Sequence, residues 1–326
     1  EWSRMAPRAG SVRRGPGNRL LLHRGTTCVG MLKPQGSGSP GHPILIGEYG
    51  DGPLPRIDAN GAHTAALHLN DVSHVAVRDL ELTNTGDLSE PHRGVYLTAT
   101  ETVVTGVELR DLFIHDVTGL VEFSGTGKSG GAIIGQVLGA SPARFDGVLI
   151  ENNRIEDVGR SGIFFIGSSS RSRPLATEEW PEGGTGVVIR GNILKRLQGD
   201  AIVAHSTSGA VIEDNVVSVG NLAGRDFRSA DRNCSAGIWA WNAHNTLIQG
   251  NEVTGYRFGQ GPTDGCDGTA FGVDYEQDGT VIQYNYSHGN EGGFVLLCSD
   301  DETRRAEVRY NLSVDDGKIA NVSPCK

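Results

Sequence analysis

The sequence predicts an all-β solenoid built from stacked parallel coils. Three observations lead to this fold class: a short strand pattern that recurs along the chain, an asparagine at the same place in most copies, and 47 glycines among 326 residues. That glycine content is about twice the usual share of roughly 7%. The glycines follow no three-residue period and there are only 13 prolines, which excludes a collagen-like chain. Hydrophobic residues make up 37% of the chain, so bulk disorder is excluded as well.

The first recurring unit is a strand of aliphatic residues, then two polar positions and an asparagine. Its copies are FDGVLIENNRI (145–155), GVVIRGNIL (186–194), GAVIEDNVV (209–217), NTLIQGNEV (245–253), GTVIQYNYS (279–287) and RAEVRYNLS (305–313). Their asparagines are Asn153, Asn192, Asn215, Asn251, Asn285 and Asn311. In VAVRDLEL (75–82) and VELRDLFI (107–114), leucine takes the place of asparagine. Self-similarity of this kind is the signature of a repeat architecture.

A second short strand alternates with the first. Its copies are GIFF (162–165), AIVA (201–204), GIWAW (237–241), AFGVD (270–274) and GFVLL (293–297). The anchors Ile163, Ile202, Ile238, Phe271 and Phe294 are separated by 39, 36, 33 and 23 residues. The local pattern has period two, and no convincing amphipathic helix of ten or more residues appears. Each coil therefore contains at least two strands, and the extra residues are loop insertions.

Stacked coils explain both the asparagines and the glycines. Each coil pairs its backbone with the coils above and below at a spacing of about 4.8 Å. An inward asparagine then hydrogen-bonds the next asparagine or an exposed turn backbone, which satisfies polar groups in a buried stack. Glycine suits the tight corners because it adopts positive φ at little steric cost. A leucine-rich repeat is the alternative architecture, but these copies prefer Val and Ile and place a second strand where a helix should follow.

Across approximately residues 40–322 the repeat resembles the right-handed parallel β-helix superfamily of pectate-lyase-like proteins. The resemblance rests on the V-x-I-x-x-N copies, their G-I/F-x-x partners, and GSGSPGHPILIGEYGDG (36–52), which is similar to the first coils of such proteins. It implies a single-stranded right-handed parallel β-helix of about nine to ten coils with loop insertions. We place an irregular segment at residues 1–19 and the β-helix domain at 20–326. The superfamily contains polysaccharide lyases and glycoside hydrolases, alongside noncatalytic adhesins and phage tailspikes.

Charge and composition limit the classes of binding partner and the cellular location that we expect. The net charge is −10 and the pI about 5.5, which disfavours nucleic-acid binding. No apolar run approaches the length of a membrane span, and the first residues do not form a signal peptide. The five cysteines are Cys28, Cys234, Cys266, Cys298 and Cys325; their long separations permit disulfides, although five cannot all pair internally. We expect a secreted or extracytoplasmic protein, and a monomer.

Equivalent positions of successive coils form rows, and one row is a candidate sugar-binding surface. If the second-strand anchors point inward, the residues three positions later point outward: His205, Trp241, Asp274 and Leu297. Trp239 also points outward. We predict that His205, Trp239, Trp241 and Tyr275 bind substrate, together with Arg225 and Arg232 of the 221–236 insertion. The alternatives are that both tryptophans pack beneath an inserted loop and that the loop arginines are merely solvated.

Insertions at 167–185, 221–236, 256–269 and 299–305 interrupt consecutive coils, and acidic residues gather where they meet the outward strands. Glycosidases need two carboxyl groups, roughly 5–5.5 Å apart for retention and 6.5–9.5 Å apart for inversion. Asp267 and Glu291 occupy nearly equivalent positions on successive coils, while Asp274 faces outward from the coil of Asp267. We predict Asp267, Asp274 and Glu291 as the catalytic set, without assigning acid and base. Asp267-Gly268 also suits an ordinary turn.

The sequence therefore predicts a glycoside hydrolase that cleaves a polysaccharide or oligosaccharide bound across the β-helix. A polysaccharide lyase acting on a uronate-containing polymer is the first alternative; it needs a base and a cation, for which Lys128 and Arg160 are candidates. A noncatalytic glycan-binding or adhesin-like β-helix is the second. The segment GTGKSG (125–130) matches G-x-G-x-x-G, but no helix follows it, so we dismiss a nucleotide site. We expect no metal site and no required cofactor, although the carboxylates would suit Ca²⁺.

Overall fold

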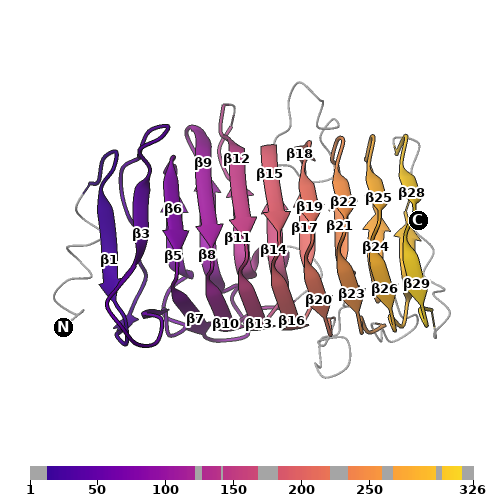
Figure 1. Cartoon of the computed structure of the whole chain (residues 1–326), viewed down its shortest axis with the longest axis horizontal. Helices are drawn as coiled ribbons and strands as arrows, with labels where there is room; N and C mark the ends of the chain where they lie inside the picture. Colours follow the sequence, from indigo (N-terminus) through magenta and orange to yellow (C-terminus); the bar gives the residue numbers. More distant parts are fainter. Residues whose placement is uncertain are drawn as a thin grey trace.

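The computed structural model describes residues 13–121, 127–140, 142–167, 183–220, 234–258, 267–298 and 303–317. These residues form ten successive coils, which follow one another in chain order along the long axis of the molecule (Figure 1). All strands pair in parallel with the equivalent strand of the next coil, in three sheets. The only helix in the described part of the chain is the single 3₁₀ turn η1 (Gly127–Ser129). The predicted all-β solenoid is confirmed, and a leucine-rich repeat is excluded.

Sheet 1 contains β1 (Arg19–His23), β3 (Ile44–Tyr49), β6 (Val75–Arg78), β9 (Val103–Arg110), β12 (Arg144–Glu151), β15 (Gly184–Arg190), β19 (Val211–Glu213), β22 (Leu247–Gln249), β25 (Val281–Gln283) and β28 (Glu307–Arg309), with the short β18 (Thr207–Ser208) paired to β15. Sheet 2 contains β2 (Thr27–Val29), β4 (Arg56–Asp58), β7 (Glu81–Thr85), β10 (Phe113–Thr118), β13 (Arg154–Val158), β16 (Ile193–Leu197), β20 (Val216–Ser218), β23 (Glu252–Thr254), β26 (Tyr286–His288) and β29 (Leu312–Val314). Sheet 3 contains β5 (Ala65–Asn70), β8 (Arg93–Ala99), β11 (Gly131–Val137), β14 (Ser161–Ile166), β17 (Ile202–His205), β21 (Ile238–Trp241), β24 (Thr269–Val273) and β27 (Gly293–Leu297).

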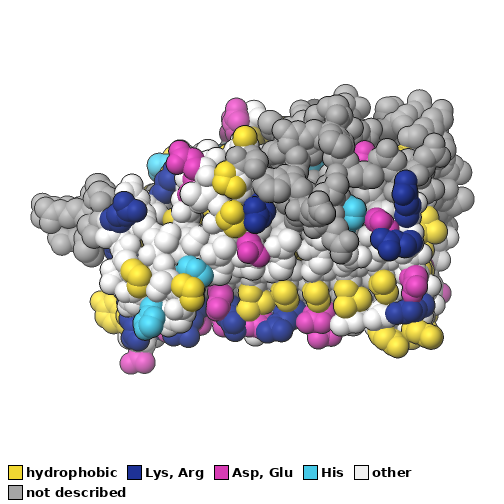
Figure 2. All heavy atoms as spheres, turned by 90° about the horizontal axis from the view of Figure 1, so that it is seen from above, with side chains coloured by type: hydrophobic (Ala, Val, Ile, Leu, Met, Phe, Trp, Pro, Cys, Tyr) yellow, Lys and Arg dark blue, Asp and Glu magenta, His cyan; other side chains and the backbone are white. Residues whose placement is uncertain are grey.

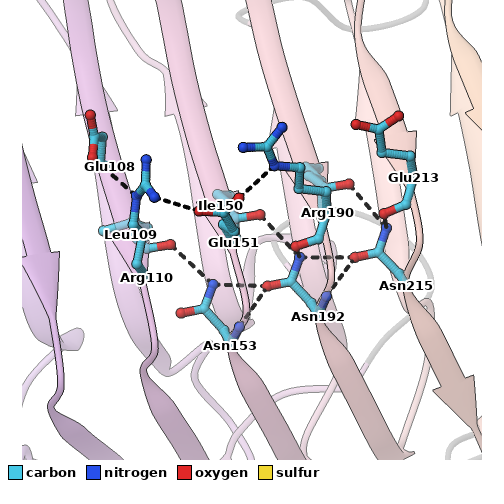
Figure 3. A network of polar contacts seen from close by, with 11 residues as sticks. Glu108, Leu109, Arg110, Ile150, Glu151, Asn153, Arg190, Asn192, Glu213 and Asn215 are labelled. Atoms are coloured by element: carbon cyan, nitrogen blue, oxygen red, sulfur yellow. Dashed lines mark hydrogen bonds and ion pairs between the residues drawn. The ribbon is translucent and has the colours of Figure 1, made fainter.

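The predicted asparagines form a continuous ladder at the corner between sheets 1 and 2 (Figure 3). Asn215 Oδ1 accepts the backbone N–H and the side-chain amide of Asn192 at 3.0 and 2.9 Å. Asn215 Nδ2 donates in turn to Asn251 Oδ1 at 2.9 Å, and the same pattern continues to Asn311. At the N-terminal side, Leu80 and Leu112 are buried where earlier copies carry leucine. The ladder lets a polar side chain stay inside the solenoid without an unsatisfied group.

Glycine occupies the corner beside this ladder less often than its abundance suggests. The residue before each ladder asparagine has positive φ, but only Gly191 (+64°) and Gly250 (+66°) are glycines. Asn152 and Asp214 take the same conformation, as short polar side chains tolerate it. Tyr284 and Tyr310 also do so, both at φ +55°, and their exposed rings stack with centroids 5.3 Å apart. The corner conformation is thus imposed by the stacked coils and not by glycine alone.

The second-strand anchors Ile163, Ile202, Ile238 and Phe271 are in register and buried, as predicted. The last anchor is wrong by one residue, because Phe271 pairs with Val295 and not with Phe294. Leu297 consequently pairs with Val273 on the inward row. It is nevertheless 58% exposed because β27 is the last strand of sheet 3 among the described residues.

The outer faces of sheets 1 and 3 differ in exposure. On sheet 1 an aliphatic row faces outward and is half-buried; its members are Leu149, Val188, Val211, Leu247 and Val281. A row of hydrophobic side chains, flanked by charged ones of both signs, runs along the molecule in Figure 2. On sheet 3 the outward residues Ile134 and Val203 have no exposed surface and Phe164 has 3%. Burial on the outside of a sheet requires covering segments, and η1 packs against β11 and β14 there.

We predict that Asn215→Ala lowers the free energy of unfolding by about 3 kcal/mol, because the buried backbone N–H of Asn192 loses its acceptor and the Ile189 carbonyl loses the Asn215 amide donor. The same change at the half-buried Asn311, in the last described coil, should cost under about 1 kcal/mol because water reaches the orphaned groups. Urea unfolding followed by circular dichroism measures both. Equal losses at the two positions would contradict the buried ladder.

Candidate active site

Sheet 3 is the face on which the predicted site residues meet. The segments joining β20 to β21 and β23 to β24 enter sheet 3, and those joining β14 to β15 and β27 to β28 leave it. All four predicted insertions therefore adjoin this sheet and none lies between sheets 1 and 2. Asp267 lies at the corner before β24, and Asp274 directly follows the end of that strand. The two residues thus flank β24 along the chain.

The outward row of sheet 3 is interrupted beside β24. In register, the row carries Tyr96, Ile134, Phe164, Val203, Trp239, Gly272 and Leu296. Gly272 is thus the one member without a side chain, and its φ is not positive, so the backbone does not require glycine. A Cβ built there would lie 3.2 Å from Trp239 Cβ and 3.8 Å from the Leu296 carbonyl oxygen. We call this place, between Trp239 and Leu296, the Gly272 gap.

Asp267 occupies a strained and electrostatically unusual corner. Its φ is +52°, and Gly268 after it is also left-handed at +70°. Burial raises the pKa of the Asp267 carboxyl to about 7, with smaller contributions from the negative charges of Asp200 and Asp274. Lys128 and Arg160 act in the opposite direction. Asp267 is therefore an acid that keeps its proton close to neutral pH, as a general acid must.

Asp274 is held in place by its own turn. Its Oδ1 accepts the backbone N–H of Tyr275 at 2.9 Å, and its backbone N–H donates to the Ala240 carbonyl of the preceding coil. The carbonyl of the half-buried Tyr275 accepts the Asn242 N–H at 3.0 Å. The row predicted from the sequence places Trp241 beside Asp274, and the pairing of Ala240 with Val273 agrees with that placement. Asp274 thus lies at the end of β24, next to Trp241 of the preceding coil.

Lys128 enters the site from η1, four coils before β24 in the stack. Its Nζ lies 4.9 Å from the ring centroid of Trp239, a cation–π distance. Burial lowers the pKa of the Lys128 ammonium, while the charges of Asp200, Asp274 and Asp267 raise it. A cation is therefore placed among the carboxylates. The sequence contained Lys128 as a candidate for a lyase only, with no row of basic residues to locate it.

Trp239 and His205 are both buried, at 6% and 3% exposure. Trp239 packs with Ile134, Phe164 and Val203 in the outward apolar cluster. The His205 ring lies 4.5 Å from that of Trp241, and its Nδ1 accepts the Gly167 N–H at 3.2 Å. Burial, with the charge of Lys128, lowers the His205 pKa to about 3, so the imidazole is neutral near pH 7.

Glu291 lies one coil beyond Asp267, at the equivalent corner, as the sequence suggested. Its Oε2 accepts the Phe258 N–H at 2.9 Å and its own N–H donates to the Tyr256 carbonyl at 2.8 Å. These bonds fasten the corner of one coil to that of the coil before. The predicted residues Arg225 and Arg232 lie outside the described residues.

The sequence missed the charged pair beneath the site. Arg160 and Asp200 are each 1% exposed, and Arg160 NH2 lies 2.9 Å from Asp200 Oδ2. No sequence motif indicated Asp200, and the sequence suggested Arg160 only as a cation for a lyase. In the described ranges no group of three or more His, Cys, Asp or Glu side chains is arranged to hold a metal ion. Within the same ranges no helix is long and apolar enough to cross a membrane.

Comparison with known proteins agrees with this architecture. Residues 139–318 match the family described as "Right handed beta helix region". The chain is 26% identical to a lacto-N-biosidase of Bifidobacterium longum subsp. longum, in an alignment that covers 93% of this chain and 24% of that protein. The crystal structure of the GH136 lacto-N-biosidase from Eubacterium ramulus is similar with a TM-score of 0.81 and 26% identity, covering 94% of this chain and 56% of that one.

The chain thus spans about a quarter of the length of its curated relative and about half of the solved one. An alginate lyase from Paenibacillus sp. shares the fold over 98% of this chain and 97% of its own, with a TM-score of 0.58 and 15% identity. This last likeness concerns the fold alone.

The raised pKa of Asp267 predicts a pH-dependent stability. Free aspartate loses its proton near pH 4, whereas folded Asp267 keeps it to about pH 7. The folded state therefore binds more protons between these values, and the free energy of unfolding falls as pH rises from about 4 to about 7. Urea unfolding should show this fall in the wild type and not in Asp267→Asn, with Asp315→Asn at an exposed corner as a control. Parallel curves for wild type and Asp267→Asn would refute the assignment.

Proposed function

Because the chain belongs to the right-handed β-helix family and is similar to two lacto-N-biosidases, we propose that it is the hydrolytic domain of a glycoside hydrolase. The observation that carries the proposal is the pair Asp267 and Asp274, one at each end of β24, with the Gly272 gap between them. Glycoside hydrolysis uses two carboxyl groups, one as general acid and the other as base or nucleophile. The negative charge of Asp274 contributes to the raised pKa of Asp267.

In the proposed reaction Asp267 is the general acid. Its pKa of about 7 leaves the carboxyl protonated in neutral and mildly acidic solution, ready to protonate the leaving glycosidic oxygen. Asp274 is then the carboxylate that attacks the anomeric carbon or activates water for that attack. Lys128, placed among the carboxylates, favours the ionised form of its neighbours as Asp267 gives up its proton. Glu291 stands outside this pair because its carboxylate is bonded at the neighbouring corner.

The substrate in this proposal is an oligosaccharide with its cleaved sugar in the Gly272 gap. The gap lies against Trp239 on one side and the Leu296 backbone on the other. His205, Trp241 and Tyr275 line the Asp274 end, and Arg225 and Arg232 remain proposed contacts from the adjoining insertion. By analogy with the relatives' names, a lacto-N-bioside is the first substrate to test.

The proposed setting is extracytoplasmic. Cys234 and Cys298 are each disulfide-bonded, whereas Cys28 is free and buried. Disulfides persist mainly in oxidising compartments. We propose that the domain acts there as a monomer and needs no cofactor; light scattering and assays with chelator test these two points.

Asp267→Asn and Asp274→Asn should each lower kcat by about 10³-fold on a chromogenic lacto-N-bioside, within the range expected for loss of an acid–base group. Glu291→Gln keeps an acceptor oxygen for the Phe258 N–H and should retain most turnover. Thermal melting serves as the folding control. Full turnover in folded Asp267→Asn or Asp274→Asn would refute the function. On a panel of acidic polysaccharides, an unsaturated, ultraviolet-absorbing product would instead establish a lyase, and binding without cleavage a glycan-binding module.

Gly272→Val should lower kcat/KM by about 100-fold by displacing the sugar from its position between the carboxyl groups. The equivalent position two coils earlier is Val203, so a valine is compatible with this strand. Gly272→Ala adds only a Cβ at 3.2 Å from Trp239 Cβ and should show a smaller loss in the same direction. Melting temperatures of both variants report any overpacking. Unchanged kinetics in the folded valine variant would exclude the Gly272 gap as the sugar site.

A further inference from the structure

We propose that Asp200 is a positioning residue, which orients the Trp239 indole and supplies the fixed negative charge beneath Asp267. The inference rests on the proposed function, because it concerns the same acid. It adds a residue that neither the sequence pattern nor the comparisons single out.

Asp200 makes contacts in three directions from the corner before β17. Its Oδ1 accepts the Trp239 Nε1–H at 3.1 Å and the Ala236 N–H at 3.1 Å. Its Oδ2 lies 2.9 Å from Arg160 NH2. Ala236 is the register partner of Asp200 in the next coil, since Ile202 pairs with Ile238. A single carboxylate thus fixes the corner of that coil and the indole ring that borders the Gly272 gap.

Arg160 is built into the same corner. Its NH1 donates to Ser235 Oγ at 2.7 Å. A Cβ at Gly199 would overlap this guanidinium, so the glycine is required for the close approach. The neighbouring Tyr256 hydroxyl donates to the Gly199 carbonyl at 3.0 Å. Both charges of the Arg160–Asp200 pair are almost fully removed from water.

A buried ion pair of this kind contributes little net stability relative to apolar residues of similar size. In this molecule the ion pair acts on the pKa of Asp267. Asp200 and Asp274 are the charged groups that favour the protonated form of Asp267, while Lys128 and Arg160 favour the ionised form. Tyr256 also faces Asp200, and burial raises the pKa of its hydroxyl well above the usual value, so it stays neutral. Removing the Asp200 charge therefore leaves Arg160 uncompensated and makes Asp267 more acidic.

The test is Asp200→Asn, which keeps an oxygen acceptor for Trp239 and Ala236 but removes the charge. In the wild type, kcat/KM should fall above about pH 7 as Asp267 loses its proton. In Asp200→Asn this alkaline limb should move down by about one pH unit or more, with KM little changed. Ser235→Ala removes the Arg160 NH1 bond without changing charge, and its limb should stay in place.

Asp200→Ala separates orientation from charge. It also removes the acceptor of the Trp239 indole N–H, so the indole is no longer held in one orientation. The KM of Asp200→Ala should therefore be about tenfold higher than that of Asp200→Asn. Trp239 fluorescence, taken as the difference from Trp239→Phe, should shift to longer wavelength in Asp200→Ala and not in Asp200→Asn. This readout does not depend on turnover.

If Asp200→Asn does not fold, the double variant Asp200→Asn/Arg160→Met removes both buried charges and carries the test. Its limb should still lie below that of the wild type, because the influence of Asp200 on Asp267 exceeds that of Arg160. If the alkaline fall of kcat/KM lies at the same pH in the folded variant as in the wild type, the inference is wrong, and Asp200 only stabilises the structure. If Asp267→Asn has normal turnover, the proposed function itself is wrong, because the alkaline fall of kcat/KM then does not come from Asp267. The two failures can therefore be told apart.

Discussion

Every structural feature of this chain depends on the in-register parallel pairing of each strand with its equivalent in the next coil. The pairing stacks like positions about 4.8 Å apart. A polar side chain pointing inward is stable only where the next coil supplies a partner at that spacing, and the chain of bonds from Asn153 through Asn192 to Asn215 meets this condition. Where the ladder stops, at Leu112, the buried residue becomes apolar. The register therefore decides which residues the interior accepts.

The same register determines where chemistry can arise. Outward rows repeat from coil to coil, so a site appears where a row changes. Along sheet 3 the outward row is filled by Phe164, Val203 and Trp239 and then reaches Gly272. The carboxyl groups of Asp267 and Asp274 lie at the two ends of that same strand. One coil thus carries Gly272 and both of the proposed catalytic aspartates, and Trp239 and Leu296 lie on the coils to either side.

The coil architecture and the positions of Asp267 and Asp274 could be predicted from the sequence because the repeat pattern determines both. Period-two strands and aligned asparagines define the register, and the register shows which residues face outward. The prediction failed at Phe294, where the loop before β27 shortens the coil and shifts the pairing to Val295. The sequence analysis also missed Asp200, and it did not predict that Lys128 lies close to β24. Both lie at corners whose lengths vary, so no repeat signal brings them to β24, and burial of a charge has no local sequence pattern.

The raised pKa of Asp267 arises from burial more than from the charges near it. Around Asp267, two anions, Asp200 and Asp274, are set against two cations, Lys128 and Arg160, whereas burial makes the largest contribution to the raised pKa. The register places Asp267 at the corner before β24, and burial there gives its carboxyl the pKa of a proton donor near neutral pH.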